Sequence, residues 1–227
     1  MEEQLAGLIA AALAFVGSHF ALSHPLRMPL VRALGARGFQ ILYSLVALAT
    51  FIWMVLAFRA VPPAPSALWN GQGDLVWAVS TGLTLIAAVL LAGSFVGNPA
   101  LPVPNAKELA KNRPRGVFHV TRHPMMWSFA LWSLAHLLVS PVPRVIVLTG
   151  AIGFLALVGA LMQDRKKEVL MGREWQRWER NTSYWPRAHR LASAGLGPWL
   201  GGLALWLGAT WGHLGLIGLP AGIWRWL

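Results

Sequence analysis

Two kinds of residue are scarce in this 227-residue chain, and each shortage excludes functions. There is no cysteine, so disulfides, iron–sulfur clusters, thiolate metal sites and a cysteine nucleophile are excluded. Charged residues make up 12% of the chain, against about 25% in a soluble domain, while 56% of the residues are hydrophobic. This composition excludes a soluble enzyme, a disordered tail and a secreted disulfide scaffold. Any metal would be held by His, Met or oxygen ligands.

Carboxylates are also few, and nucleotide-binding glycine motifs are absent from the sequence. The chain has eight acidic residues, and both aspartates, Asp74 and Asp164, fall at the edges of apolar segments. No Ser-His-Asp set can therefore form inside a membrane core. Neither a P-loop nor a Rossmann glycine fingerprint occurs in the sequence. Hydrolases and nucleotide-driven pumps are excluded.

What the chain does contain is a series of long apolar runs, which we interpret as membrane-spanning helices. The predicted spans are residues 5–22, 39–58, 75–96, 125–139, 145–162 and 196–216. A polar, tryptophan-bearing stretch over residues 164–190 predicts one amphipathic helix in the cytoplasmic interface. The expected fold class is all-α: a polytopic transmembrane bundle of about six helices, forming a single domain over residues 1–227.

The 19 basic residues are distributed unevenly around these spans. All except Arg59, Arg144 and Arg225 fall in the segments after the first, third and fifth spans, which lie on one side of the membrane. By the positive-inside rule, those segments face the cytoplasm and both termini lie on the other side of an inner membrane. Topology and anionic lipid thus account for the net charge of +11. The lipid bilayer is the partner that this charge predicts, and nucleic acid is not.

The seven histidines differ in their depth in the predicted bundle. His189 lies in the cytoplasmic basic stretch and carries little functional weight. His119 and His123 are four residues apart, as in a two-histidine site on a helix, but Pro124 follows at once. No carboxylate or third histidine lies close to them in the sequence. This spacing alone does not favour a zinc or di-iron site.

His136 is the most informative histidine, because every neighbour within its span except Ser133 is apolar. An ionisable side chain at that depth is a functional candidate, and the structural alternative is a neutral ring bonded to a carbonyl. His19 lies near the inner end of the first span and His213 toward the outer end of the last. Histidines on different membrane helices, in a chain with many aromatics and no cysteine, favour haem b held by two imidazoles.

Several stretches of the chain resemble a known family of multi-pass membrane proteins. They are Gly17-Ser-His-Phe-Ala-Leu-Ser-His-Pro-Leu-Arg, Gly35-Ala-Arg-Gly-Phe-Gln-Ile-Leu-Tyr-Ser, Thr121-Arg-His-Pro-Met-Met-Trp, Trp132-Ser-Leu-Ala-His and Leu207-Gly-Ala-Thr-Trp-Gly-His. Their joint spacing resembles the NnrU family, which includes the plant and cyanobacterial 15-cis-ζ-carotene isomerase. The resemblance covers nearly the whole chain.

The resemblance implies haem b as the cofactor, with its two axial ligands on His19 and His136. Helix geometry puts these two residues about 10 Å apart in depth, so His123 and His213 are alternative ligands. His123, the histidine of the Arg-His-Pro motif, is also an expected cofactor contact.

The resemblance also bears on residues around the ligands. We expect Arg122 and Arg27 near the haem propionates at the cytoplasmic face, where both also serve as topology charges. Ser133 replaces a cysteine of the isomerase, so a thiolate redox switch cannot operate here. His119 stands where the isomerase has arginine.

By the same resemblance, the protein is linked to nitrite and nitric oxide metabolism in denitrifying bacteria, or to haem-dependent cis–trans isomerisation. The expected substrate is a hydrophobic polyene or a small gas. Two alternatives stay open. A membrane methyltransferase similar to the isoprenylcysteine carboxyl methyltransferases, which share the Arg-His-Pro motif, would place His123 and Glu168 near S-adenosylmethionine. A non-catalytic membrane partner would deliver haem to a reductase or regulate it.

Overall fold

The computed structural model describes residues 2–63 and 67–227, so of the domain predicted over residues 1–227, Met1 and residues 64–66 lie outside the described part. Every regular element in that part is helical, as predicted. The long helices are α1 (Glu2–Ser23), α2 (Arg27–Ala60), α3 (Asp74–Gly93), α5 (Pro124–Val139), α6 (Pro143–Met171) and α8 (Leu196–Ile217). The short ones are α4 (Ala106–Lys111), α7 (Arg173–Asn181), η1 (Gly116–His119), η2 (Ala188–Ala194) and η3 (Gly222–Arg225).

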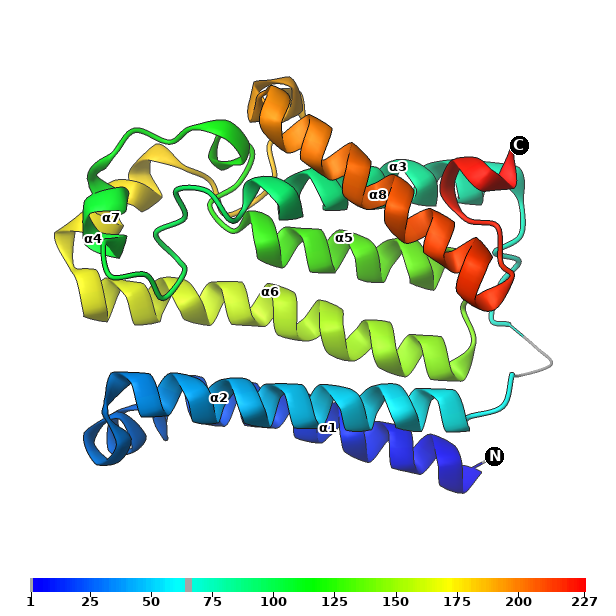
Figure 1. The fold of residues 1–227 in the computed structure, drawn as a ribbon, viewed down its shortest axis with the longest axis horizontal. Helices are drawn as coiled ribbons and strands as arrows, with labels where there is room; N and C mark the ends of the chain where they lie inside the picture. Colours follow the sequence, from blue (N-terminus) through cyan, green and yellow to red (C-terminus); the bar gives the residue numbers. More distant parts are fainter. Residues whose placement is uncertain (1, 64–66) are drawn as a thin grey trace.

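Figure 1 shows the long helices running along one axis. Both chain termini lie at one end of the bundle, which we call the terminal end, and α4 and α7 lie at the other, which we call the basic end. Five of the long helices are apolar and long enough to cross a membrane. The remaining predicted span, residues 125–139, corresponds to α5, an apolar helix of 16 residues, or roughly 24 Å at 1.5 Å per residue. The chain is a multi-pass membrane protein.

The segment between the first two predicted spans is largely helical, because α2 begins well before the predicted span over residues 39–58. Helix α2 begins at Arg27 and bends at Gly35, whose φ of +70° lies in the left-handed region that favours glycine. The turns before the bend carry Arg27 and Arg32, and the predicted span over residues 39–58 follows Gly35. A basic, partly apolar helical segment next to a span is typical of a helix that lies at a membrane interface.

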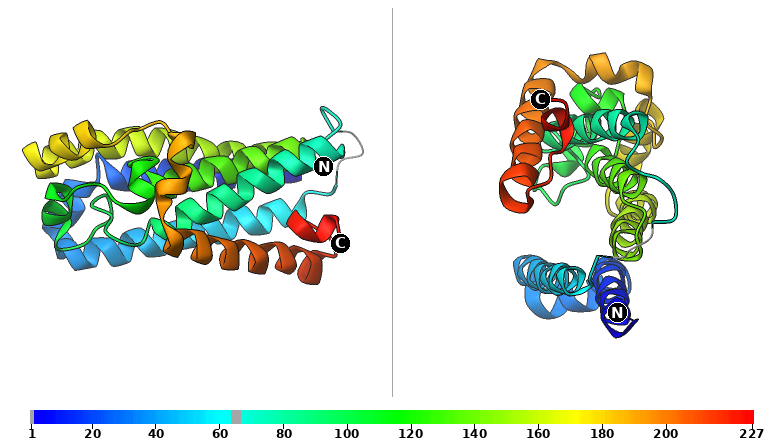
Figure 2. Two further views of the ribbon diagram at one scale, coloured as in Figure 1. Left: turned by 90° about the horizontal axis from the view of Figure 1, so that it is seen from above. Right: turned by 90° about the vertical axis from the view of Figure 1, so that its right-hand side faces the viewer.

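The helices pack in two groups that meet along α6. Helix α3 packs against α5 and α8, and α5 packs against α6. Helix α1 packs on α2 and on α6, where Leu8, Ala11 and Met54 form a buried cluster with residues of α6. The right-hand view of Figure 2 shows the α1–α2 pair set apart from α3, α5 and α8. The cavity described below lies between these two groups of helices.

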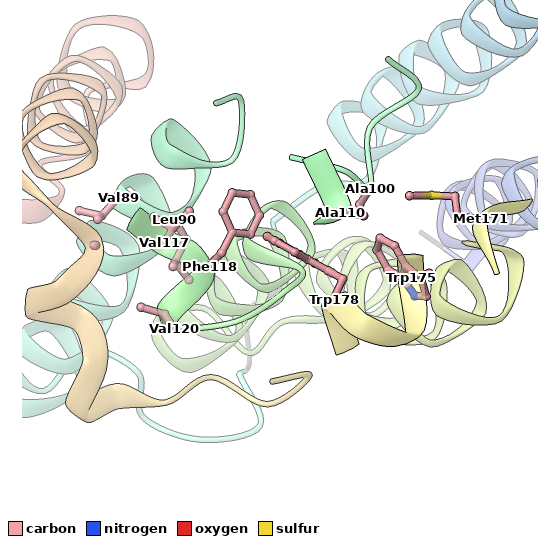
Figure 3. Packing of buried hydrophobic residues seen from close by; sticks show 11 residues of the cluster. Val89, Leu90, Ala100, Ala110, Val117, Phe118, Val120, Met171, Trp175 and Trp178 are labelled. Atoms are coloured by element: carbon pink, nitrogen blue, oxygen red, sulfur yellow. The ribbon is translucent and has the colours of Figure 1, made fainter. Parts of the chain in front are cut away.

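A second core lies at the basic end and contains the amphipathic helix predicted from the sequence, which is α7. Its tryptophans Trp175 and Trp178 are buried in the protein instead of facing lipid. Figure 3 shows Trp178 beside Phe118 from η1, with their ring centroids 5.3 Å apart, and Trp175 further along the same core, toward Met171. Gly172, with φ +62°, separates α7 from α6. The loop from α3 to α5 therefore covers the face that sequence reasoning assigned to the membrane.

The close approach of α3 and α8 depends on Gly202. A Cβ atom there would lie 2.5 Å from Val89 Cα and 2.6 Å from Val89 N, so the two backbones would have to separate. We expect Gly202→Ala to lower the free energy of unfolding by about 1–3 kcal/mol, as overpacking does. Gly208→Ala in the same helix is the control, because nothing lies within 4 Å of its Cβ position. Equal stability of the two variants in detergent would contradict this packing.

Candidate functional site

A cavity of about 940 Å³ lies between the two groups of helices, with walls from α1, α2, α3, α5, α6 and α8. Its lining is mainly aromatic and aliphatic, and it includes four histidines: His19, His24, His136 and His213. No aspartate or glutamate among the described residues lines it. A large apolar cavity with a few convergent polar groups is typical of a ligand or cofactor site.

Three of these histidines are held in the same way. Nδ1 of His19 lies 2.7 Å from Phe15 O, Nδ1 of His136 lies 2.8 Å from Trp132 O, and Nδ1 of His213 lies 2.9 Å from Ala209 O. Because a carbonyl can only accept, each Nδ1 carries the proton and each Nε2 keeps its lone pair. Metal-binding histidines are commonly oriented by such a second hydrogen bond.

His136 and His213 lie together toward the terminal end. Their ring centroids are 6.1 Å apart, and the Trp132 ring lies 4.1 Å from that of His136. A metal shared by two imidazoles needs roughly this separation, because each nitrogen lies about 2 Å from the metal and each ring centre about 1 Å further. The sequence-based alternative ligand His213 is therefore next to the principal one.

His19 and His24 line the cavity nearer the basic end. His19 packs against Phe15 and against Tyr43, with ring centroids 4.4 and 5.6 Å away. His24 makes only long contacts, 3.4 Å from Phe20 O and 3.5 Å from Met162 O. Sequence reasoning did not single out His24, although its place five residues after His19 was a usable signal.

Arg122 and His123 are not among the residues that line this cavity. Arg122 donates through Nε to both carboxylate oxygens of Asp164, at 2.9 and 3.0 Å. His123 donates through Nε2 to Asp164 Oδ1 at 2.8 Å, and its side chain is fully buried. The Arg-His-Pro motif thus ties the start of α5 to α6 through one carboxylate. Sequence reasoning set Asp164 aside because it lies at a helix edge, and so missed this cluster.

Glu179 extends the cluster to α7, with an oxygen 3.5 Å from the Arg122 guanidinium. Burial, together with repulsion from the Asp164 carboxylate, raises the pKa of Glu179. Nearby, Trp127 Nε1 and Thr121 Oγ1 both donate to Tyr184 O, at 2.8 Å each. This network fixes the segment after α7 against the start of α5.

Three further predicted residues lie outside the cavity lining. Arg27 places its guanidinium 5.8 Å from the centre of the Phe39 ring. Ser133 is buried against α6, where a Cβ on Gly153 would lie 3.4 Å from Ser133 Cβ. His119 ends η1 and is exposed, whereas His123 precedes α5, so the two do not share a helix face. Among the described residues there is no group of three or more His, Asp or Glu side chains that could hold a metal ion.

An all-α bundle with several apolar spans and a large histidine-lined cavity between its helices defines a polytopic membrane protein. The NnrU protein family matches residues 7–221 of the chain. The chain therefore belongs to the NnrU family. No curated protein and no solved structure gives a match to it.

Proposed function

We propose that this NnrU protein binds haem b in the cavity, where His136 would be one of the residues that hold the iron. The observation that carries the proposal is the set of imidazoles whose Nε2 lone pairs remain available in an apolar cavity. Two neutral imidazoles suffice for haem, whereas a structural zinc ion takes four ligands. Among the described residues, no group of three or more His, Asp or Glu side chains could hold a metal ion, so the available ligands fit haem better than zinc.

We propose His19 as the second ligand, as the family resemblance implies. Contacts with α6 give the relative level of the two residues: His24 lies at Met162, whereas Ser133 lies at Gly153. At 1.5 Å per residue these contacts put His19 and His136 roughly 10 Å apart along the bundle, as expected from the sequence.

The side chains reduce this offset. Each Nδ1 bonds the carbonyl four residues earlier, so each ring leans toward the N-terminus of its own helix. Helix α1 runs toward the basic end and α5 runs away from it, so the two rings lean toward one another. A haem held by both would join the α1–α2 pair to the rest of the bundle.

Haem held in this cavity would supply one-electron redox chemistry. The protein's own contribution is an apolar, largely aromatic and aliphatic wall and fixed imidazoles, which suit a hydrophobic polyene or a small gas better than a polar substrate. By family resemblance we assign the role to nitrite and nitric oxide metabolism or to haem-dependent isomerisation. The same cavity would also suit a non-catalytic haem carrier. If the protein is such a carrier, His136→Ala would change a partner's activity, and no substrate turnover would be detected.

Filling the cavity tests the proposal without removing a histidine. Ala47 on α2 lines the cavity, whereas Ala49 on the same helix is exposed and does not. We expect Ala47→Trp to lower the haem content of the purified protein several-fold, because the indole occupies the space of the macrocycle. Ala49→Trp should leave haem content unchanged. Equal haem content in both variants would place the cofactor elsewhere.

We also propose that the basic end faces the cytoplasm, with both termini outside it in an inner membrane, because almost all basic residues gather at that end. Single cysteines can test this cleanly, since the chain has none of its own. In intact spheroplasts, a membrane-impermeant maleimide should label Asn70→Cys, between α2 and α3. Asn112→Cys, after α4, should react only after permeabilisation. The reverse labelling pattern would invert the topology.

A further inference from the structure

The cavity is not equally apolar along its length. Six residues of α6 line it at helical spacing and form one continuous wall: Ile152, Leu155, Ala156, Gly159, Gln163 and Lys166. The first four are apolar, with Ala156 and Gly159 small enough to leave room for a planar ligand, and the last two are an amide and an amine. The polar pair lies toward the basic end, with Gln163 about 10 Å and Lys166 about 15 Å beyond Ala156 at 1.5 Å per residue.

Lys166 is the positively charged residue in the lining of the cavity. It is half-buried, and no carboxylate among the described residues lies within 4 Å of its amine. No other lysine or arginine in the described part lines the cavity. An amine at the end of an apolar cavity, without a counter-charge from the protein, favours binding of an anionic group there.

The neighbouring basic residues differ from Lys166, because each already contacts another group of the protein. Lys167 is buried and donates to Pro99 O at 2.9 Å and to Leu101 O at 3.3 Å. Arg122 is bound to Asp164, and Arg27 lies over Phe39. Lys166 makes no hydrogen bond or ion pair of this kind in the described part of the chain.

We infer that Lys166 binds the carboxylate of a haem propionate at the basic end of the cavity. This inference rests on the proposed function and assigns to Lys166 the contact that sequence reasoning gave to Arg122 and Arg27. Haem has a flat apolar ring system with two carboxylates along one edge, and the α6 wall has the same order: apolar surface, then an amide and a cation. The amide Nε2 of Gln163 already donates to Ala100 O at 3.3 Å, which leaves the anion to Lys166.

The test compares haemin with haemin dimethyl ester, in which both propionates are uncharged. Affinities of the full-length detergent-purified protein are measured by absorption titration. For haemin we expect Lys166→Gln to weaken binding by roughly tenfold, the effect of one lost charge-assisted hydrogen bond. For the dimethyl ester the same substitution should change affinity little. Lys166→Arg should retain most of the haemin affinity, and Lys107→Gln, at an exposed position on α4, is the control.

Three other outcomes would contradict the inference or the proposed function. Equal weakening of haemin and its ester by Lys166→Gln, or no weakening of either, would overturn the propionate contact. If Lys166→Gln instead lowers the amount of anionic phospholipid bound to haem-free protein and leaves haemin affinity unchanged, the anion is a lipid headgroup and the inference fails. If the unmodified protein binds neither haemin nor the ester, the proposed function itself fails.

Discussion

His136→Ala is expected to abolish stable haem binding, with haem content falling by more than roughly tenfold, since even changes outside the ligand shell cost 10–100-fold in metal affinity. The ring has a free Nε2 in an apolar cavity, and no carboxylate among the residues that the structure describes lines that cavity to replace it. The measurement is the Soret absorbance per chain after growth with added haem precursor. His119→Ala is the matched control, because His119 is exposed and does not line the cavity.

Absorption spectra of further histidine-to-alanine variants identify the second haem ligand. His19→Ala should convert a low-spin, six-coordinate spectrum into a high-spin one, and added imidazole should restore the low-spin form. His213→Ala should leave the low-spin spectrum in place. If His213→Ala gives the high-spin form and His19→Ala does not, the ligand pair is His136 and His213, whose rings are 6.1 Å apart.

Asp164→Asn is expected to lower the free energy of unfolding by about 3 kcal/mol, because it removes the charge that Arg122 and His123 share. The Asp164 and Arg122 side chains are only 10% and 14% exposed, so solvent cannot replace the lost partner. Asp74→Asn is the control: its ion pair with Arg225 is at the surface, with Asp74 78% exposed, and its loss should cost less than about 1 kcal/mol. Unfolding of both variants in denaturing detergent, followed by tryptophan fluorescence, compares them. Similar stabilities would contradict a structural role for the Asp164 cluster.

The sequence was sufficient for features that depend on local pattern. The six apolar runs are all helices, and an ionisable residue among apolar neighbours pointed to His136, which lines the cavity. The amphipathic pattern around Trp175 located α7, but not the surface that the tryptophans contact. That surface is the loop between α3 and α5, whose position depends on tertiary packing.

Contacts between distant segments were beyond sequence reasoning. Asp164 looked like a helix-edge charge, and only the fold brings it to Arg122, 42 residues earlier. Lys166 and Lys167 are adjacent in a basic run and cannot be told apart there. In the structure one bonds backbone carbonyls and the other lines the cavity, because successive residues point to different faces of a helix.

Haem binding in this cavity underlies both the proposed function and the contact with Lys166. The decisive measurement is the absorption spectrum of the purified protein, oxidised and then reduced with dithionite, after haem supplementation. We predict a Soret band with sharp α and β bands on reduction, at one haem per chain. A colourless protein that cannot be loaded with haemin would contradict the account, and calorimetry with S-adenosylmethionine would then test the methyltransferase alternative.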